Sequence, residues 1–242
     1  MKLIMTAILF LTTELLYGQS FEGTLVYKAD FEFHISEKMA QMGITEEMMK
    51  EKIKNDGSWS DSIKTSYKQG EYITYTNSIP QSWSVYKQKD NKLYSFQNGE
   101  ASDICTVTDA SIDLEFQMTG NKPTIEKLDT LVELNGMKCE VVRVRWQAGI
   151  YDYYYNNSFL NVNYKLFEKH VYDGWADFLK ISNSLPVKIV KSVNSLTTVT
   201  LTLVRHSQQT IDPKLFTIPK LVTDKDLNIF KTGNREIMRI KK

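Results

Sequence analysis

The clearest pattern in the chain is a strict alternation of apolar and polar residues over positions 21–34. Leu25, Tyr27 and Phe31 fall on one face of this segment, and charged residues such as Lys28 and Asp30 alternate with them on the other. Alternation with a period of two is typical of a β-strand that has one buried and one solvated face. The pattern therefore predicts a long first strand whose apolar face contributes to a core.

The next segment, about 36–56, changes to a helical pattern. Ser36 and Thr45 are helix-start residues, and each precedes a run of charged and apolar positions. The apolar positions of this insert are mostly methionines: Met39, Met42, Met48 and Met49. These side chains have three possible roles, namely packing on the sheet, forming an adaptable cover over an apolar cavity, or binding Cu(I) through sulfur. The sequence predicts one or two short helices but leaves these roles open.

Short strands at close spacing follow between positions 63 and 205. The breaks between them contain turn residues, of which Asn98-Gly99 is the strongest hairpin signal. Alternation predicts further strands over 112–118 and over 151–155, and Asp173 is expected to cap a short helix that ends at Ile181. About ten strands without βαβ alternation predict an antiparallel sheet.

The N-terminus carries the features of an export signal. Met1-Lys2 is a short cationic start, an apolar run follows to Leu16, and Gly18 supplies a small residue at the expected cleavage site. We therefore expect a signal peptide over 1–18 and a periplasmic or secreted mature protein without a transmembrane segment. Residues 19–221 are expected to form a single antiparallel-β domain, and 222–242 a polar, mildly basic tail.

The charge balance limits the kinds of binding partner that are expected, and the two cysteines raise the question of a disulfide. Thirty Lys and Arg residues against 29 Asp and Glu residues argue against a nucleic-acid partner. The two cysteines, Cys105 and Cys139, favour a disulfide in an oxidising compartment, with two separate buried thiols as the alternative.

Several segments together resemble a family of exported proteins. These are the first strand Phe21-Glu22-Gly23-Thr24-Leu25-Val26-Tyr27, the methionine-rich insert, the step Asn135-Gly136-Met137-Lys138-Cys139, and the closing segment from Ile211 to Pro219. The chain is similar to uncharacterised exported domains of Gram-negative bacteria that are related to the LolA/LolB lipoprotein carriers and to the GLPGLI group. The resemblance implies a mainly β fold, a curved antiparallel sheet in the form of an open half-barrel covered by short helices. In the carriers, the concave apolar face holds acyl chains. The motif that names the GLPGLI group is absent from this chain.

Residues that could carry chemistry form no recognisable catalytic pattern. His34, His170 and His206 have neither metal-ligand spacing nor a nucleophile motif beside them, and we expect ordinary surface or strand-end histidines. Asp113 and Glu115 are expected to face water on one side of a strand. We therefore predict a protein that is not an enzyme and has no metal or other cofactor.

The leading expectation is a binding protein that holds a hydrophobic or amphipathic ligand, such as a lipid or a lipoprotein acyl chain, on the concave face of the sheet. The alternatives are a structural envelope protein that docks a protein partner and, with less support, an envelope hydrolase that uses His170 or His206. Six residues are expected to line the ligand cavity: Phe31, Phe33, Met39, Met42, Met48 and Trp146.

Overall fold

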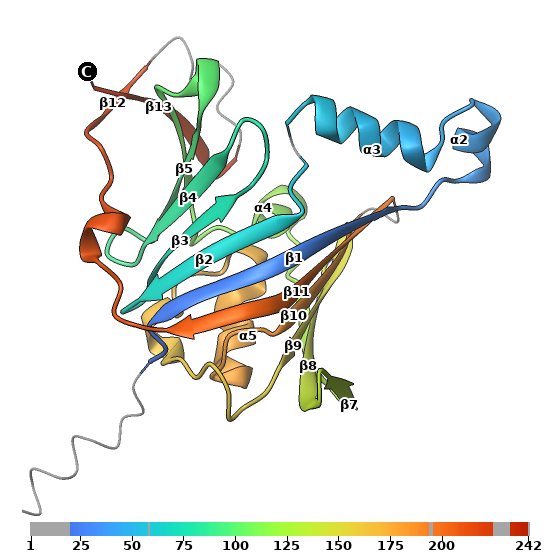
Figure 1. Ribbon diagram of the computed structural model, residues 1–242. Helices are drawn as coiled ribbons and strands as arrows, with labels where there is room; N and C mark the ends of the chain where they lie inside the picture. The colour runs from blue at the N-terminus through green and yellow to red at the C-terminus, as the bar shows by residue number, and fades with distance from the viewer. Residues whose placement is uncertain (1–19, 58, 194–195, 225–232, 242) are drawn as a thin grey trace, which may run out of the picture.

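One large antiparallel sheet forms the body of the protein (Figure 1). The computed structural model describes residues 20–57, 59–193, 196–224 and 233–241. These residues form thirteen strands, which are β1 (Gly23–Phe33), β2 (Ser62–Lys68), β3 (Glu71–Thr76), β4 (Ser82–Lys87), β5 (Lys92–Gln97), β6 (Ile104–Asp109), β7 (Thr124–Leu134), β8 (Met137–Arg145), β9 (Gly149–Tyr155), β10 (Lys188–Val193), β11 (Thr197–Gln208), β12 (Leu221–Thr223) and β13 (Arg235–Ile240). The sheet is not closed into a barrel, so the prediction of a mainly β, open antiparallel sheet is confirmed.

The strand order shows how one strand joins the two halves of the sheet. It runs β12-β13-β6-β5-β4-β3-β2-β1-β11-β10-β9-β8-β7, so that β1 lies between β2 and β11. The alternation of β1 is as expected: Leu25, Tyr27 and Ala29 are buried, whereas Lys28 and Asp30 on the opposite face are exposed. Because β1 pairs with a strand on each side along much of its length, it fixes the register of both halves.

Helical elements fill the concave side of the sheet. They are α5 (Trp175–Ser182) and two 3₁₀ turns that precede it, η3 (Tyr164–Phe167) and η4 (Tyr172–Gly174). Figure 1 shows α5 on the inner side of the curved sheet. Phe178 and Leu179 of α5 are fully buried in the largest core cluster, together with Tyr153 and Tyr155 of β9. This helix, which the sequence indicates by its apolar face, is the element that covers the concave face.

The methionine-rich insert does not cover the sheet. It forms α2 (Glu37–Gln41) and α3 (Glu46–Asn55), which extend as an arm beyond the end of β1 and away from α5 (Figure 1). Neither helix contains a buried residue, and Met42 and Met48 are 67% and 54% exposed. The expectation that this insert closes the concave face is therefore wrong, because α5 and its preceding turns already occupy that space.

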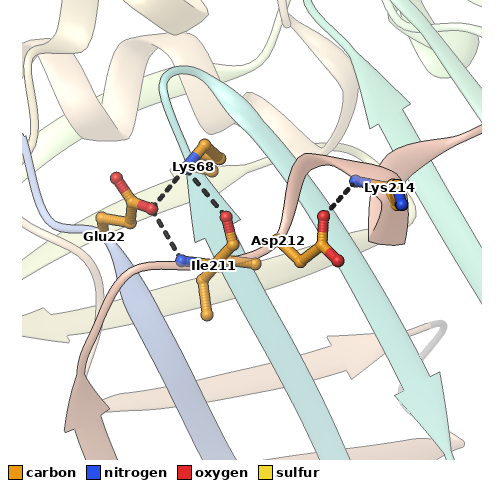
Figure 2. Close-up of polar contacts among 5 residues, drawn as sticks. All are labelled: Glu22, Lys68, Ile211, Asp212 and Lys214. Atoms are coloured by element: carbon orange, nitrogen blue, oxygen red, sulfur yellow. Dashed lines mark hydrogen bonds and ion pairs between the residues drawn. The ribbon is translucent and has the colours of Figure 1, made fainter.

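The convex side carries a second, smaller core. The chain that follows β11 crosses it through η5 (Pro213–Phe216), and Ile211 and Phe216 pack there with Ile73 of β3 and Val85 of β4. Figure 2 shows what holds this strap in place. One Glu22 carboxylate oxygen accepts from the backbone N–H of Ile211 at 2.7 Å and from Lys68 Nζ at 2.6 Å, and Lys68 also donates to the Ile211 carbonyl at 2.8 Å.

Two segments differ from their expected form. Residues 112–118 are not a strand: α4 (Leu114–Thr119) begins after Asp113, whose carboxylate caps the helix by accepting from Phe116 N–H at 2.8 Å.

The expected polar tail includes β13, which pairs with β6 and extends the sheet. The basic residue Arg239 is part of that strand through its pairing with Ile104, and its side chain forms an ion pair with Asp103 at 2.8 Å. The sheet therefore continues beyond residue 221.

The two cysteines do not form the expected disulfide. Cys105 lies on β6 and Cys139 on β8, and eight strands separate β6 from β8 in the sheet. Both are free, fully buried thiols, and burial raises the pKa of Cys105 to about 12. A disulfide requires Cα atoms within about 7 Å of each other, a condition that two strands so far apart in one sheet do not meet.

The expected signal peptide, residues 1–18, lies outside the described residues, and so does part of the expected tail. Within the part of the chain that the structure describes, there is no helix long and apolar enough to cross a membrane.

We predict that Glu22→Ala destabilises the fold by about 1–3 kcal/mol, because it leaves the Lys68 ammonium and the Ile211 N–H without their shared acceptor. Urea unfolding followed by circular dichroism measures the change. Glu46→Ala is the matched control, since Glu46 pairs with Lys50 on an exposed helix, and we expect a smaller effect there. Equal effects of the two substitutions would contradict the role of Glu22.

We also predict that both cysteines react with iodoacetamide when the protein is unfolded in guanidinium without a reductant. In the native state both should resist alkylation, because they are buried and their pKa values are raised by burial. Intact-mass spectrometry counts the added groups. Recovery of a chain that accepts two groups only after reduction would mean that a bridge exists.

Candidate functional site

A cavity of about 340 Å³ lies between the concave face of the sheet and the η4–α5 segment. We call it the central cavity. Aromatic and aliphatic side chains from seven strands form its sheet side, and they are Tyr27, Ile63, Tyr67, Tyr72, Leu93, Tyr153, Ile189 and Leu201. His170, Asp173 and Trp175 line it from the helical side, and Lys191 reaches it from β10. Thr65, Thr74 and Ser84 add hydroxyl groups on the sheet side, so the cavity is largely apolar and has polar groups on both sides.

The strand pairing explains why tyrosines gather on the concave face, where Tyr67 and Tyr72 line the cavity and Tyr86 lies beside Tyr72. Tyr67 and Tyr72 are directly opposite each other on β2 and β3, and Tyr72 is opposite Tyr86 on β4, so all three project from the concave face. The rings of Tyr72 and Tyr86 stack with a centroid distance of 5.2 Å. Residues that oppose each other across an antiparallel pair share a face, so the register places these rings in one row.

His170 packs against this row from the helical side. It is 2% exposed, its ring lies 4.5 Å from that of Tyr86, and its Nε2 forms a hydrogen bond with the Tyr72 hydroxyl at 2.8 Å. Burial lowers the pKa of His170 to about 4, although the nearby Asp173 carboxylate opposes the shift. Burial also raises the pKa of Tyr72 well above its ordinary value. Both groups are therefore neutral near pH 7, contrary to the expectation of an ordinary surface histidine.

Asp173 holds the rim of the central cavity in an unusual backbone conformation. Its φ of 60° is left-handed, which is unfavourable for a residue with a side chain, and Gly174 beside it is also left-handed. Its carboxylate accepts from Lys191 Nζ at 2.7 Å, and its carbonyl accepts from the Tyr153 hydroxyl at 2.7 Å. Burial alone would lower the pKa of Lys191, but the Asp173 carboxylate raises it overall. Asp173 thus secures η4 to β9 and β10 and does not cap α5 as expected.

Two polar atoms of cavity-lining residues are buried without a hydrogen-bond partner. They are Nδ1 of His170 and Nε1 of Trp175. Native proteins seldom leave buried donors or acceptors unpaired, since each costs about 1–3 kcal/mol. Both nitrogens are fully buried, so neither is exposed to the open volume of the central cavity.

A smaller cavity of about 200 Å³ adjoins the central one, and Tyr172 and Asp173 line both. Trp146 and Tyr151 form its aromatic wall, with ring centroids 4.8 Å apart and ring planes inclined at 62°. Asp113 and Glu115 also line this cavity, which we call the side cavity. Glu115 accepts from two backbone N–H groups of the β8–β9 turn, and Asp113 accepts from Trp146 Nε1 at 2.8 Å. These carboxylates join α4 to the turn, whereas the sequence predicted solvated side chains.

The six residues expected to line a cavity are not brought together. Trp146 lines the side cavity. Phe33 is buried near the far end of β1, and the ring of Phe31 packs on Trp59 with centroids 4.9 Å apart, at the base of the arm. Met39, Met42 and Met48 lie on the arm itself. None of the six lines the central cavity, because the cavity is covered by α5 and not by the arm.

The hydrolase alternative required a histidine that meets a serine and a carboxylate. His170 contacts Tyr72 instead, and the ring of His206 lies edge-on to Phe159 at 4.9 Å. Over the described ranges of the chain, no group of three or more His, Cys, Asp or Glu side chains is placed to hold a metal ion.

Sequence reasoning missed the residues that line the central cavity from its helical side. His170, Asp173 and Trp175 are close in sequence, yet their role depends on strands more than 80 residues away, such as β3. The sequence did contain one indication of this turn. Asp and Gly both tolerate left-handed backbone conformations, so Asp173-Gly174 is as compatible with a tight turn as with the start of a helix. The residues that such a turn holds against a sheet cannot be inferred from it.

Comparisons with known proteins give no family assignment. No family model matches the chain, and no curated protein matches it. Among solved structures, PNGF-II in each of two space groups is similar over 80% and 81% of this chain, with 10% identity and a TM-score of 0.41 in both cases. This chain covers only 29% and 30% of those chains. A similarity of this size carries no information on function, and the resemblance to the LolA/LolB and GLPGLI groups stays a prediction.

We predict that His170 makes the fold less stable as the pH falls from about 6.5 to 4. The pKa of His170 is lowered to about 4 in the folded state, so the unfolded chain binds more protons in this window. The contribution lost across the window is on the order of 3 kcal/mol. Urea unfolding at several pH values measures it.

In that experiment His170→Gln should flatten the pH dependence, since glutamine does not titrate. The exposed His206 supplies the matched control, and His206→Gln should leave the slope of the wild-type protein unchanged. Identical slopes for the wild-type protein and His170→Gln would show that His170 is not held neutral by burial.

Proposed function

We propose that this protein is an exported, non-enzymatic binding protein that holds an apolar or amphipathic ligand, such as a lipid or an acyl chain, in the central cavity. The observation that carries the proposal is the cavity itself, whose lining is mostly aromatic and aliphatic, with a few polar groups on the sheet side and on the helical side. Small-molecule sites are typically concave, mostly apolar cavities of about 300–1,000 Å³ with few polar groups that orient the ligand. A cavity of about 340 Å³ is at the small end of that range.

The charges around the central cavity also favour a ligand without an unpaired charge. Lys191 and Asp173 form an ion pair with each other, and His170 is neutral near pH 7. Burial of apolar ligand surface is therefore the main source of binding free energy, at about 25 cal/mol per Å².

A second candidate is a docking protein for an envelope partner. It is favoured by the exposed arm, on which Met42 and Met48 project from helices without a buried residue. Exposed methionines are common on surfaces that bind protein partners. The experiment below separates the two candidates, because the docking function needs no ligand in the cavity.

We predict that the neutral fluorophore N-phenyl-1-naphthylamine binds the wild-type protein with a Kd in the micromolar range. Leu201→Trp should weaken this binding at least tenfold, because the indole would fill part of the central cavity. Thr200→Trp is the matched control: it adds the same side chain to the same strand but on the opposite face, and should change Kd by less than twofold. Fluorescence titration measures all three proteins.

A wild-type protein that does not bind the probe, or equal weakening by both substitutions, would refute ligand binding in the central cavity. The first result would leave the arm-mediated docking function as the better account. Met48→Ala should have no effect on probe binding in any case, because Met48 lies on the arm.

A further inference from the structure

A further cavity lies beside the point where β10 begins. Strand β10 begins at Lys188, opposite Thr202 of β11, whereas β11 continues to Gln208. The N–H of Leu203 still donates to the Val187 carbonyl at 2.8 Å, and beyond that residue β11 pairs with β1 alone among the described strands. A cavity of about 300 Å³ lies at this place, where β11 has lost one of its two neighbours. We call it the strand-end cavity.

Most of the lining of the strand-end cavity is apolar. The turn between β7 and β8, the loop after β9, the residue before β10 and strand β11 contribute the apolar side chains, which are Leu134, Met137, Phe159, Val187, Leu203 and Val204. Val204 is 60% exposed, so part of this apolar surface is in contact with water. Covering it with an alkyl chain is favourable, because apolar surface is then removed from water.

The acidic and basic residues of this lining are of one kind. Lys188 and Arg205 line the cavity together with His206, and among the described residues no Asp or Glu lines it. The Lys188 ammonium lies 5.3 Å from the centroid of the Tyr154 ring, and Arg205 is exposed. Over the described ranges of the chain, neither cation has a carboxylate partner.

Carboxylates on the neighbouring strands are already paired with other cations. Asp152 lies two residues before Tyr154 on the same face of β9, and it pairs with Arg143 at 2.7 Å. Asp30 of β1 pairs with Lys28, also at 2.7 Å. These carboxylates therefore leave the two cations of the cavity available to an anion from outside the chain.

The strand-end cavity differs in this respect from the central cavity, whose cation Lys191 is paired with Asp173. Long cationic side chains commonly lay their methylene stems along apolar surface and keep their charged ends in water. A ligand that combines an alkyl chain with an anionic head group would use both parts of such a lining. A guanidinium is well suited to the head group, because it binds carboxylates and phosphates with two parallel hydrogen bonds.

We propose that the strand-end cavity binds an amphiphile with an anionic head group, such as a fatty acid. The alkyl chain packs on Met137, Phe159 and Leu203, and the head group pairs with Arg205 and Lys188. Because this site is separate from the central cavity, it does not depend on the proposed function.

Three ligands with the same eight-carbon chain test the site: octanoate, 1-octanol and octylammonium. Each is titrated below its micellar concentration against protein that carries ¹³C-labelled methionine methyl groups, and nuclear magnetic resonance follows the Met137 signal, which Met137→Leu identifies. We expect octanoate to move this signal with a Kd at least fivefold lower than that of 1-octanol, and octylammonium to bind most weakly. The signals of Met42 and Met48, which lie on the arm, should not move.

A substitution of the guanidinium tests the recognition of the head group. Arg205→Gln should reduce the preference for octanoate over 1-octanol to less than twofold and leave the binding of 1-octanol unchanged. Lys64→Gln is the matched control, since Lys64 is an exposed cation on β2 in the other half of the sheet, and it should preserve the preference.

The outcomes separate this site from the central cavity. Leu93→Trp fills part of the central cavity from β5, four strands away from β11, and should leave the Met137 response to octanoate unchanged. Loss of the response in that variant would place octanoate in the central cavity and overturn the proposal. A Met137 signal that none of the ligands moves, or that octanoate and 1-octanol move with equal affinity, would overturn it as well. A wild-type protein that shows the Met137 response but does not bind N-phenyl-1-naphthylamine would retain this site without the proposed function.

Discussion

The packing of η3, η4 and α5 against the concave face is the interaction on which the rest of the structure depends. Phe178 stacks on Tyr153 with ring centroids 4.6 Å apart, and Phe167 stacks on Tyr86 at 6.0 Å, so the helical segment contacts strands from both halves of the sheet. An open sheet with one uncovered apolar face would expose that face to water. This segment buries it and ties together strands that are not neighbours in the sheet. Strands β4 and β9, for example, do not pair with each other.

The central cavity is a consequence of how the segment is attached. Gly174 has a left-handed φ of 67°, and a side chain there would lie within 2.9 Å of Val144, so the turn approaches β8 more closely than other residues allow. The turn then directs Asp173 toward β10, where it pairs with Lys191. A buried or partly buried ion pair contributes little net stability. The pair joins the turn to β10, and together with the two left-handed residues it places Asp173 at the rim of the cavity.

The sequence predicted the features that depend on local periodicity. The alternation of β1 and of the tyrosine strand β9, the open antiparallel sheet, and the helix near Ile181 are all present. Residues 112–118 were misread because a short alternating run does not distinguish a strand from a helix when Asp113 can cap it. The helical insert at about 36–56 was predicted correctly, but its position relative to the sheet was not. Periodicity shows which face of a helix is apolar, and it does not show which part of the protein packs against that face. The burial of His170 depends on Tyr72 and Tyr86, and the separation of Cys105 from Cys139 depends on the strand order. Both are long-range properties that one sequence does not contain.

The covering segment also decides which charges lie beside the concave face. Burial keeps the His170 imidazole neutral near pH 7, and it keeps the Tyr72 phenol protonated. Lys191 and Asp173 lie at the rim and pair with each other at 2.7 Å. The space between the sheet and α5 is therefore lined mainly by apolar and aromatic groups, because the titratable groups of the helical side are either paired or held neutral.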